Sequence, residues 1–436
     1  MKVVTTLERR AASTGPSRMS SSASGEHTLL HEYETSSMAL TWQQAEALQR
    51  EKAVDVTPTS GGRWEVTANS RVGTLDVAGV RLLIRPKIRP ENLFLLLEPG
   101  LPARAWGSEP FEYDTTSDLL PSVVAFFART VETTLARGVL RSYRTRDESS
   151  VAFRGRIDTP GQFRRAGLLI PTACTYDDFT VDISENRALR AAVRRVLRVP
   201  GVAAMERGRL KRQLAALEGV SDVHVRPETI DSIHLTRLND HYGPALRLSR
   251  LMLANLTLMD RGGETTASSF TVDMNDLFQR FVTHRLRTAL RGKLEVVEEP
   301  VVHLGIGRRV PMNPDLIFRR SADGIAYVGD VKYKIAQDAR GRSSDYYQLL
   351  AYTTALELTE GMLIYCRRQG EELDRTVTVR YSGKRLLVYA VDLTGGASQV
   401  EQEIANLAAR IWEVASVSRR KELVAGIRSE SASIGK

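Results

Sequence analysis

The sequence predicts an α+β protein with a small N-terminal β-rich domain, a mainly helical middle region and a C-terminal α/β domain in which helices flank a mixed sheet. Three patterns lead to this prediction. Residues 63–88 alternate apolar and polar side chains, which is typical of antiparallel strands. Residues 118–259 carry apolar stripes at helical spacing, and after residue 270 helical and strand patterns alternate. We therefore expect a disordered lead at 1–37, the β-rich domain at 38–112, the helical region at 113–265, the α/β domain at 266–416 and a flexible tail at 417–436.

Composition places the chain among ordinary soluble globular proteins, because 42% of its 436 residues are hydrophobic and 26% are charged. No apolar run approaches the ~20 residues of a membrane helix, and the first residues lack the apolar stretch of a secretory signal. The two cysteines, Cys174 and Cys366, lie far apart and outside any zinc-binding spacing, as in a reducing compartment. We therefore expect a cytoplasmic protein without membrane contact. The net charge of +9 suits a polyanionic partner such as nucleic acid.

The N-terminal half predicts one short helix, a β unit and then a series of helices. Residues 41–51 predict the short helix, and the β unit turns at Gly73 and Gly79. Further helices are expected over 118–146, 185–199, 207–220 and 242–259. The stretch RGGETTASS at 261–269 is turn-rich and predicts a boundary.

The C-terminal half predicts a helix, three strands, a helix, three strands and a closing helix. Asp273 can cap the first helix, and Gly292 lies where that helix would end. Ser344 can cap the second helix, which covers 343–358. The strands are expected at about 294–303, 309–320, 325–334, 361–366, 375–382 and 385–393, and the closing helix at 398–414.

Three charged side chains interrupt two of these apolar strands. Asp315 lies in VPMNPDLIF, and Asp330 and Lys332 lie in IAYVGDVKY, although a buried charge is costly unless it is paired or coordinated. If the two runs form a hairpin, a loop at 322–323 places Asp315 opposite Asp330, whereas a loop at 323–324 places it opposite Lys332. Both registers put the three charges on one face of the sheet.

Two carboxylates that meet in such a place repel each other, and a divalent cation relieves the repulsion. Mg²⁺ commonly binds one or two protein carboxylates and keeps its other positions for water and phosphate oxygens. Lys332 is suited to hold an attacking water or to neutralise charge on a phosphate. The pattern therefore predicts phosphodiester hydrolysis. The alternative is a buried ion pair of Lys332 with Asp315 or Asp330 that has no catalytic role.

Further stretches connect these residues with a known family. The PD at 314–315 and the DVK at 330–332 resemble the PD-(D/E)xK nuclease signature. Gln348 and Tyr352 share a helix face, which resembles the QxxxY element of the RecB-like branch, although such a face is also typical of simple core packing. LLIRPKI, RGVLRSY with FRGRID, DISENRAL and FTVDMNDLFQRFV extend the likeness over nearly the whole chain beyond the lead. Together they resemble the McrC family, the nuclease subunit of modification-dependent restriction systems.

This resemblance implies a fold, a reaction and partners. The fold is a C-terminal PD-(D/E)xK restriction-endonuclease-like domain, while the N-terminal domain at 38–112 docks on a ring of the AAA+ GTPase McrB. The reaction is cleavage of double-stranded DNA that carries modified cytosine, with Mg²⁺ as the cofactor and Mn²⁺ as a substitute, together with stimulation of the GTPase. The implied metal ligands are Asp315, Asp330 and Val331, and the implied catalytic residues are Asp315, Asp330, Lys332, Gln348 and Tyr352. GTP is bound by the partner, because this chain has no GxxxxGK[ST] motif.

One position departs from the family pattern, and two other functions stay open. Gln279 stands where the pattern DMNxLFE has an acidic residue, so Asp276 is a candidate to compensate, or Gln279 is an ordinary exposed helix residue. The neutral amide leaves open a weakly catalytic activator of an AAA+ ring, and a generic RecB-like DNA-repair nuclease is the third alternative. Arg154 and Arg156 are candidate DNA contacts, whereas the arginines of 185–199 are expected on a solvated helix face.

Overall fold

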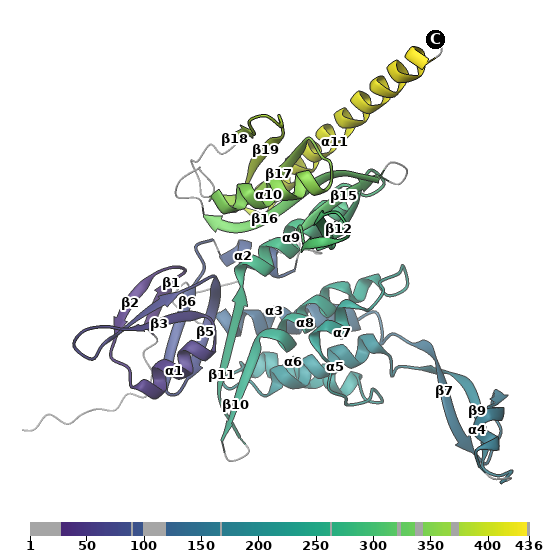
Figure 1. Ribbon diagram of the computed structural model, residues 1–436. Coiled ribbons are helices and arrows are strands. Elements are labelled where there is room, and N and C mark those ends of the chain that lie inside the picture. The colour runs from purple at the N-terminus through teal and green to yellow at the C-terminus, as the bar shows by residue number, and fades with distance from the viewer. Residues whose placement is uncertain are drawn as a thin grey trace, which may run out of the picture.

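The computed structural model is a mixed α+β structure (Figure 1). It describes residues 28–88, 90–98, 119–165, 168–261, 264–320, 324–335, 343–367 and 375–433. Most of the predicted disordered lead, residues 1–27, lies outside these ranges. Within them, no helix combines the length and the apolarity that crossing a bilayer demands.

A small antiparallel sheet and one helix follow the first strand. The sheet has the order β2 (Thr35–Met38), β4 (Trp64–Ala68) and β3 (Val54–Pro58). Helix α1 (Trp42–Arg50) begins at a capping box, in which the Thr41 hydroxyl accepts a hydrogen bond from a backbone N–H of the first turn. The predicted helix and β unit are therefore both present.

Residues 28–37 form the strand β1, a short turn and most of β2, so the prediction of a disordered lead is wrong for them. β1 (Thr28–His31) pairs in parallel with β6 (Val80–Arg85), which pairs with β5 (Arg71–Val77). The Leu30 side chain is completely buried in this sheet. A four-residue strand with one buried leucine is too short to show a recognisable period, which is why it was not expected.

The predicted break at 261–269 lies in a β-hairpin. β10 (Leu256–Arg261) pairs with β11 (Glu264–Asp273), and β11 also pairs with β5, which gives a sheet of order β1-β6-β5-β11-β10. Strands β5 and β11 approach closely at Gly73 of β5, where an added Cβ would collide with the Phe270 carbonyl oxygen of β11. The Ser- and Thr-rich run is a strand because it pairs with β10, and the residues after it, 270–273, pair with β5. The N-terminal sheet thus takes one strand from beyond the predicted boundary.

Helices form the centre of the middle region. Its helices are α3 (Leu119–Leu135), α5 (Ser184–Leu197), α6 (Ala204–Ala216), α7 (Pro227–Asp231) and α8 (Gly243–Asn255), with a 3₁₀ turn at Asp240–Tyr242. Helix α2 (Pro90–Leu97) precedes them in sequence and packs on the C-terminal region. The buried Tyr242 hydroxyl donates to the Asn186 side chain and accepts from the Leu140 N–H, so it joins α5 to the chain that follows α3. Helix α3 ends earlier than predicted because Gly138 turns the chain with a φ of 95°.

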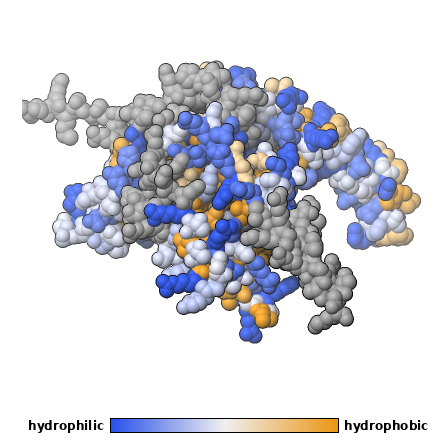
Figure 2. All heavy atoms as spheres, turned by 90° about the horizontal axis from the view of Figure 1, so that it is seen from above, coloured by the Kyte–Doolittle hydropathy of each residue, from blue (hydrophilic) through white to orange (hydrophobic). Residues whose placement is uncertain are grey.

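A three-stranded antiparallel arm projects from this region (Figure 1). It contains β7 (Ser142–Ser150), β8 (Arg156–Ile157), the short helix α4 (Thr159–Phe163) and β9 (Thr172–Thr180). The prediction of a mainly helical region did not include this arm, because β7 is exposed almost throughout and shows no apolar stripe. Several large apolar side chains are exposed on the arm, and Figure 2 shows them gathered at its end on the right of the view.

A six-stranded mixed sheet forms the C-terminal region, as predicted. Its order is β12 (Glu295–Glu298), β15 (Leu316–Arg320), β16 (Gly324–Ile335), β17 (Glu360–Arg367), β19 (Arg385–Asp392) and β18 (Arg375–Thr378). β16, β17 and β19 run parallel, and the other pairs are antiparallel. Between β12 and β15 the chain forms a separate hairpin of β13 (Val302–Gly305) and β14 (Arg309–Met312).

Helices cover both faces of this sheet. α10 (Ser343–Ala355) packs on one face, where Leu349 and Tyr352 join an apolar cluster with Leu363. α9 (Met274–Ala289) and α11 (Ala397–Ser433) pack on the other face. The Asp273 side chain caps α9 as predicted. α11 continues to Ser433 and does not end near residue 416 as expected.

The N-terminal half packs directly on the C-terminal sheet. The Tyr333 hydroxyl on β16 donates to the buried Glu32 carboxylate at 3.2 Å, just after β1. The Asn92 side-chain amide on α2 donates to the backbone carbonyls of Leu393 and Gly395 at 2.5 and 2.7 Å. The two halves are therefore joined by buried polar contacts.

Candidate active site

Asp315 is placed at the start of β15 by hydrogen bonds to its neighbours. Its Oδ2 accepts a hydrogen bond from the Val331 N–H at 2.7 Å, and its carbonyl oxygen accepts one from the Glu299 N–H at 3.1 Å. Its side chain is 15% exposed. The carboxylate is therefore fixed by the backbone of β16 and keeps an open side.

The β15–β16 hairpin brings the three predicted charges together. Leu316 pairs with Gly329, so the next position places Asp315 opposite Asp330. Asp330 Oδ2 lies 2.8 Å from Lys332 Nζ, and Asp315 Oδ2 lies 3.7 Å from the same nitrogen. The first of the two predicted registers therefore holds at the site. A register shift after Phe318 ends that register before the turn.

The charges at this site do not balance. Two carboxylates share one ammonium, and the Asp330 side chain is completely buried. Burial, and then the negative charge of Asp315, raise the pKa of Asp330. Burial alone would lower the pKa of Lys332, but Asp330 and Asp315 outweigh burial and raise it. Lys332 is therefore an ammonium, and one negative charge stays uncompensated.

The residues present fit a magnesium ion. Although Lys332 Nζ is near, neither Asp330 oxygen receives a well-directed hydrogen bond from the described part of the chain. A buried acceptor without a donor is costly, and a cation would satisfy it. The described residues contain no cluster of three or more metal-ligating side chains. Two carboxylates with open positions for water and phosphate suit Mg²⁺ better than a metal that needs a complete protein cage.

Helix α10 supports the site through Gln348 and Tyr352. The Gln348 amide donates to the Tyr352 hydroxyl at 2.6 Å, and this hydroxyl donates to the Asn313 carbonyl oxygen at 3.0 Å. Burial, together with the carboxylates of Asp330 and Asp315, raises the pKa of Tyr352 although the Gln348 hydrogen bond lowers it. Tyr352 therefore stays a neutral donor and fixes the chain two residues before Asp315.

Glu299 is a residue near the site that sequence patterns did not indicate. The Gln279 amide donates to its Oε1 at 3.0 Å, and its N–H binds the Asp315 carbonyl. Its φ is 48°, which is unusual for a residue other than glycine. Asp276 does not compensate for Gln279, because its carboxylate pairs with Arg280 at 2.8 Å. No sequence period signals Glu299, because its position depends on the bend after β12.

The basic segments lie elsewhere. Arg154 and Arg156 are on the exposed arm, and the Arg154 guanidinium lies over the Tyr176 ring at 5.9 Å. The arginines of α5 have partners within the chain: Arg187 and Arg194 pair with Asp182 and Asp222, and Arg190 and Arg195 donate to the Leu217 and Leu256 carbonyls. The expected solvated face is present only in part, because Arg194 is exposed whereas the other three arginines are half-buried.

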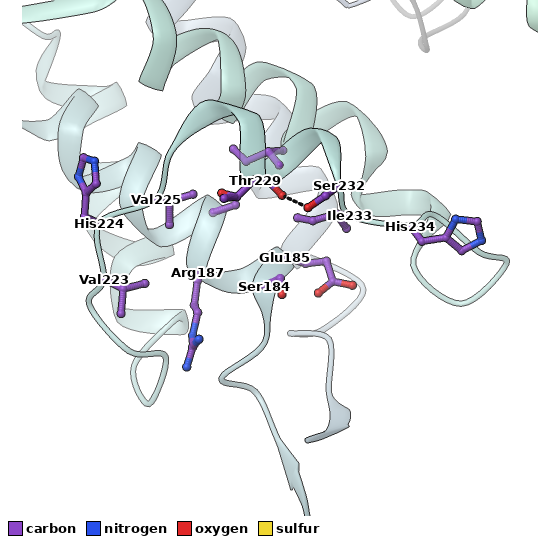
Figure 3. Close-up of a pocket in the computed structure, with 12 residues that line it drawn as sticks. Ser184, Glu185, Arg187, Val223, His224, Val225, Thr229, Ser232, Ile233 and His234 are labelled. Carbon is purple, nitrogen blue, oxygen red and sulfur yellow. Dashed lines mark hydrogen bonds between the residues drawn. The ribbon is translucent and has the colours of Figure 1, made fainter. Parts of the chain in front are cut away.

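A separate pocket of about 420 Å³ lies in the helical region between α5 and α7 (Figure 3). Its polar lining includes Glu185, His224 and His234, and the two histidines stand at opposite ends of the view. Arg187 also lines it, but its guanidinium is bound to Asp182. None of the predicted site residues lines this pocket.

Comparisons with known proteins agree with the likeness seen in the sequence. Residues 66–366 match the family model described as McrBC 5-methylcytosine restriction system component. No curated protein gave a significant match. A refined half-complex from a tetradecameric assembly of Thermococcus gammatolerans McrB AAA+ hexamers with bound McrC contains a chain with the same fold, with 20% identity, a TM-score of 0.50 and coverage of 88% of this chain and 100% of that chain. A chain in the cryo-EM structure of the Thermococcus gammatolerans McrBC complex is 22% identical, with a TM-score of 0.40 and coverage of 61% and 88%.

Proposed function

The chain belongs to the McrBC 5-methylcytosine restriction system component family, and from this premise we propose that it is the Mg²⁺-dependent DNA-cleaving subunit of a GTP-dependent restriction complex. The observation that carries the proposal is the buried Asp330, with Asp315 and Lys332 beside it on one face of adjacent strands. The six-stranded sheet with helices on both faces supports the assignment to the PD-(D/E)xK restriction-endonuclease-like fold.

In this proposal the side chains act by holding charge at fixed places. Asp315 and Asp330 would hold the ion and the main chain of Val331 keeps Asp315 in position. When bound, Mg²⁺ supplies positive charge at the scissile phosphate and at the attacking water. The Lys332 ammonium would stabilise the negative charge that develops on the phosphate oxygens. Tyr352 would orient the segment that carries Asp315.

We propose an AAA+ GTPase ring as the partner, because the solved structure that shares this fold contains McrB AAA+ hexamers with bound McrC. GTP would bind to the ring, and its hydrolysis would be stimulated by this chain. The N-terminal domain at 38–112 stays a proposed docking region. The arm is a second candidate, because its exposed Phe163, Leu169 and Ile170 lack the cover that apolar side chains normally have. The substrate would be double-stranded DNA with modified cytosine, in the cytoplasm.

The proposal is tested by Lys332→Ala in the complete complex with its ring. The assay supplies GTP, Mg²⁺ and a duplex containing methylated cytosine, and it measures strand breaks and GTP hydrolysis separately. We expect cleavage to fall by roughly 10²-fold or more, as for the loss of one transition-state charge partner, while GTP hydrolysis is unchanged. Lys211→Ala removes an exposed lysine on α6 and serves as the matched control. Cleavage that survives in the Lys332 variant would remove the assignment.

A second candidate function is a non-cleaving activator of the ring. The observation that favours it is the neutral Gln279 beside Glu299, because it adds no charge to the metal site. Stimulated GTP hydrolysis without strand breaks in the wild-type complex would establish this function. A generic DNA-repair nuclease would instead cut unmodified duplexes without the ring and GTP.

A further inference from the structure

The β13–β14 hairpin is anchored beside the candidate active site. At its base, Val302 and Met312 pack against the apolar cluster that contains Tyr352. The Tyr352 hydroxyl holds the Asn313 carbonyl immediately after the hairpin. The next aspartate along the chain is Asp315. The base of the hairpin is therefore fixed to the same helix and the same loop that position the site.

The tip of the hairpin, in contrast, contacts little of the protein. Ile306 is 99% exposed, and Val310 and Leu304 are also exposed. Three residues of the hairpin have left-handed backbone angles: Gly307 with a φ of 72°, Arg308 with 59° and Val310 with 54°. This conformation is costly for a β-branched residue such as Val310, and backbone strain of this kind gathers at binding and catalytic sites. The tip of the hairpin is therefore exposed to solvent and has an unusual backbone conformation.

Two arginines at this tip are free to bind an external anion. Arg308 and Arg309 are exposed, and neither guanidinium has a hydrogen-bond or ion-pair partner among the described residues. Residues 300–314 contain no acidic side chain. The arginines of α5, by comparison, are bound to carboxylates or carbonyls of the chain. Guanidinium groups without internal partners are well suited to phosphate.

The distance from the hairpin arginines to the candidate active site can be compared with the spacing of phosphates along a DNA duplex. Arg309 precedes Asp315 by six positions, and six extended residues span at most about 20 Å. A duplex rises about 3.4 Å per base pair, so this distance corresponds to roughly six base pairs. A phosphate bound at Asp315, Asp330 and Lys332 therefore has other phosphates of the same duplex within reach of the two arginines.

We propose that the β13–β14 hairpin binds the phosphate backbone of double-stranded DNA through Arg308 and Arg309, within about six base pairs of the cut, and so positions the scissile phosphate. This inference rests on the proposed nuclease function. An exposed apolar tip would also suit a protein partner, but two unpaired guanidinium groups next to a phosphate-handling site favour DNA. Apolar side chains such as Ile306 occur in elements that enter the minor groove, so the tip is compatible with this partner.

The test measures DNA binding separately from cleavage. The full chain, assembled with its ring, carries Lys332→Ala so that the duplex stays intact, and anisotropy gives the affinity for a methylated duplex over a range of salt concentrations. Adding Arg308→Ala and Arg309→Ala should weaken binding at least tenfold and lower the slope of log K against log salt by about 1.8, because two phosphate contacts are lost. The control is Arg375→Ala with Arg380→Ala, which removes the same charge from the opposite edge of the sheet. We expect the control to bind like the parent.

Each outcome decides the inference. Unchanged affinity and slope in the hairpin variant would overturn it, and the nuclease proposal would stand if the wild-type complex still cuts. A hairpin variant that fails to assemble with the ring but binds DNA normally would also overturn it and would assign the hairpin to a protein partner. Hairpin-dependent binding in a wild-type complex that never cuts would support DNA binding by the hairpin, but it would remove the nuclease function and with it the role of the hairpin in positioning a scissile phosphate. Circular dichroism of the variants checks that each one is folded.

Discussion

The Asp330→Asn variant separates a metal site from a structural ion pair, because the two predict opposite changes in stability. Without metal, the wild-type site holds two carboxylates and one ammonium, and Asp330 is completely buried. Burial and Asp315 raise the pKa of Asp330 from 3.8 to about 7. That difference corresponds to about 4 kcal/mol that the folded protein loses when Asp330 is ionised. Asparagine removes this cost and leaves Lys332 beside Asp315.

The expected gain is smaller than the full electrostatic cost, because the buried amide that replaces the carboxylate also lacks hydrogen-bond partners. Such a group costs about 1–3 kcal/mol, which leaves a net gain of about 2 kcal/mol for the metal-free variant. For a chain of 436 residues that unfolds as one unit, that gain raises the melting temperature by about 2 °C. A structural ion pair predicts the reverse, a loss of about 3–5 kcal/mol, because its ammonium loses its closest partner.

Thermal melting in a chelator and in excess Mg²⁺ at pH 8 is the assay. At a Mg²⁺ concentration of about 100 times its Kd, the wild-type protein should gain about 2.7 kcal/mol, and Asp330→Asn should gain almost nothing. Asp55→Asn is the matched control, because it makes the same change at an exposed position on β3. The reasoning is refuted if Asp330→Asn melts below the wild type in chelator and if both proteins respond equally to Mg²⁺.

Three further predictions concern the support of the site and of the fold. Tyr352→Phe removes the hydrogen bond to the Asn313 carbonyl. Strand breaks should therefore form about tenfold more slowly, and thermal melting should show a loss of about 1 kcal/mol in stability. Equal cleavage by the variant and the wild type would show that this contact does not position the site. Gly73→Ala should cost about 2 kcal/mol or more in thermal melting, because the new Cβ collides with the Phe270 carbonyl in the adjoining strand. His284 has a pKa lowered to about 4, first by burial and then by nearby arginines, so the unfolded chain binds more protons between pH 6.5 and about 4. Stability should therefore be complete above pH 6.5 and should fall by up to roughly 3 kcal/mol as the pH drops through this window, and His284→Gln should flatten the profile.

The sequence predicts secondary structure and the site most accurately where the spacing of apolar residues along an element matches the face that the element buries. The three charges were expected on one face because strand side chains alternate strictly. The prediction of a shared face holds because the register shift lies between the site and the turn, so the pairs next to the site keep one register. The arm was missed because β7 is exposed almost throughout and so shows no apolar period. β1 was missed because its partner, β6, lies about fifty residues away in sequence. Glu299 was missed because its contact with Asp315 depends on a bend that no residue pattern encodes.

The strand β11 has a consequence for how this chain can be divided. A fragment that begins at the predicted boundary, residue 266, contains the complete six-stranded sheet, yet it also takes most of β11 away from its place between β5 and β10. Such a fragment also lacks Glu32, the buried carboxylate that accepts a hydrogen bond from Tyr333, the residue after Lys332 on β16. The C-terminal half is therefore not an independent folding unit. Grafting it onto another scaffold would require the first hundred residues as well, so recombination between relatives should preserve both halves as one inherited unit.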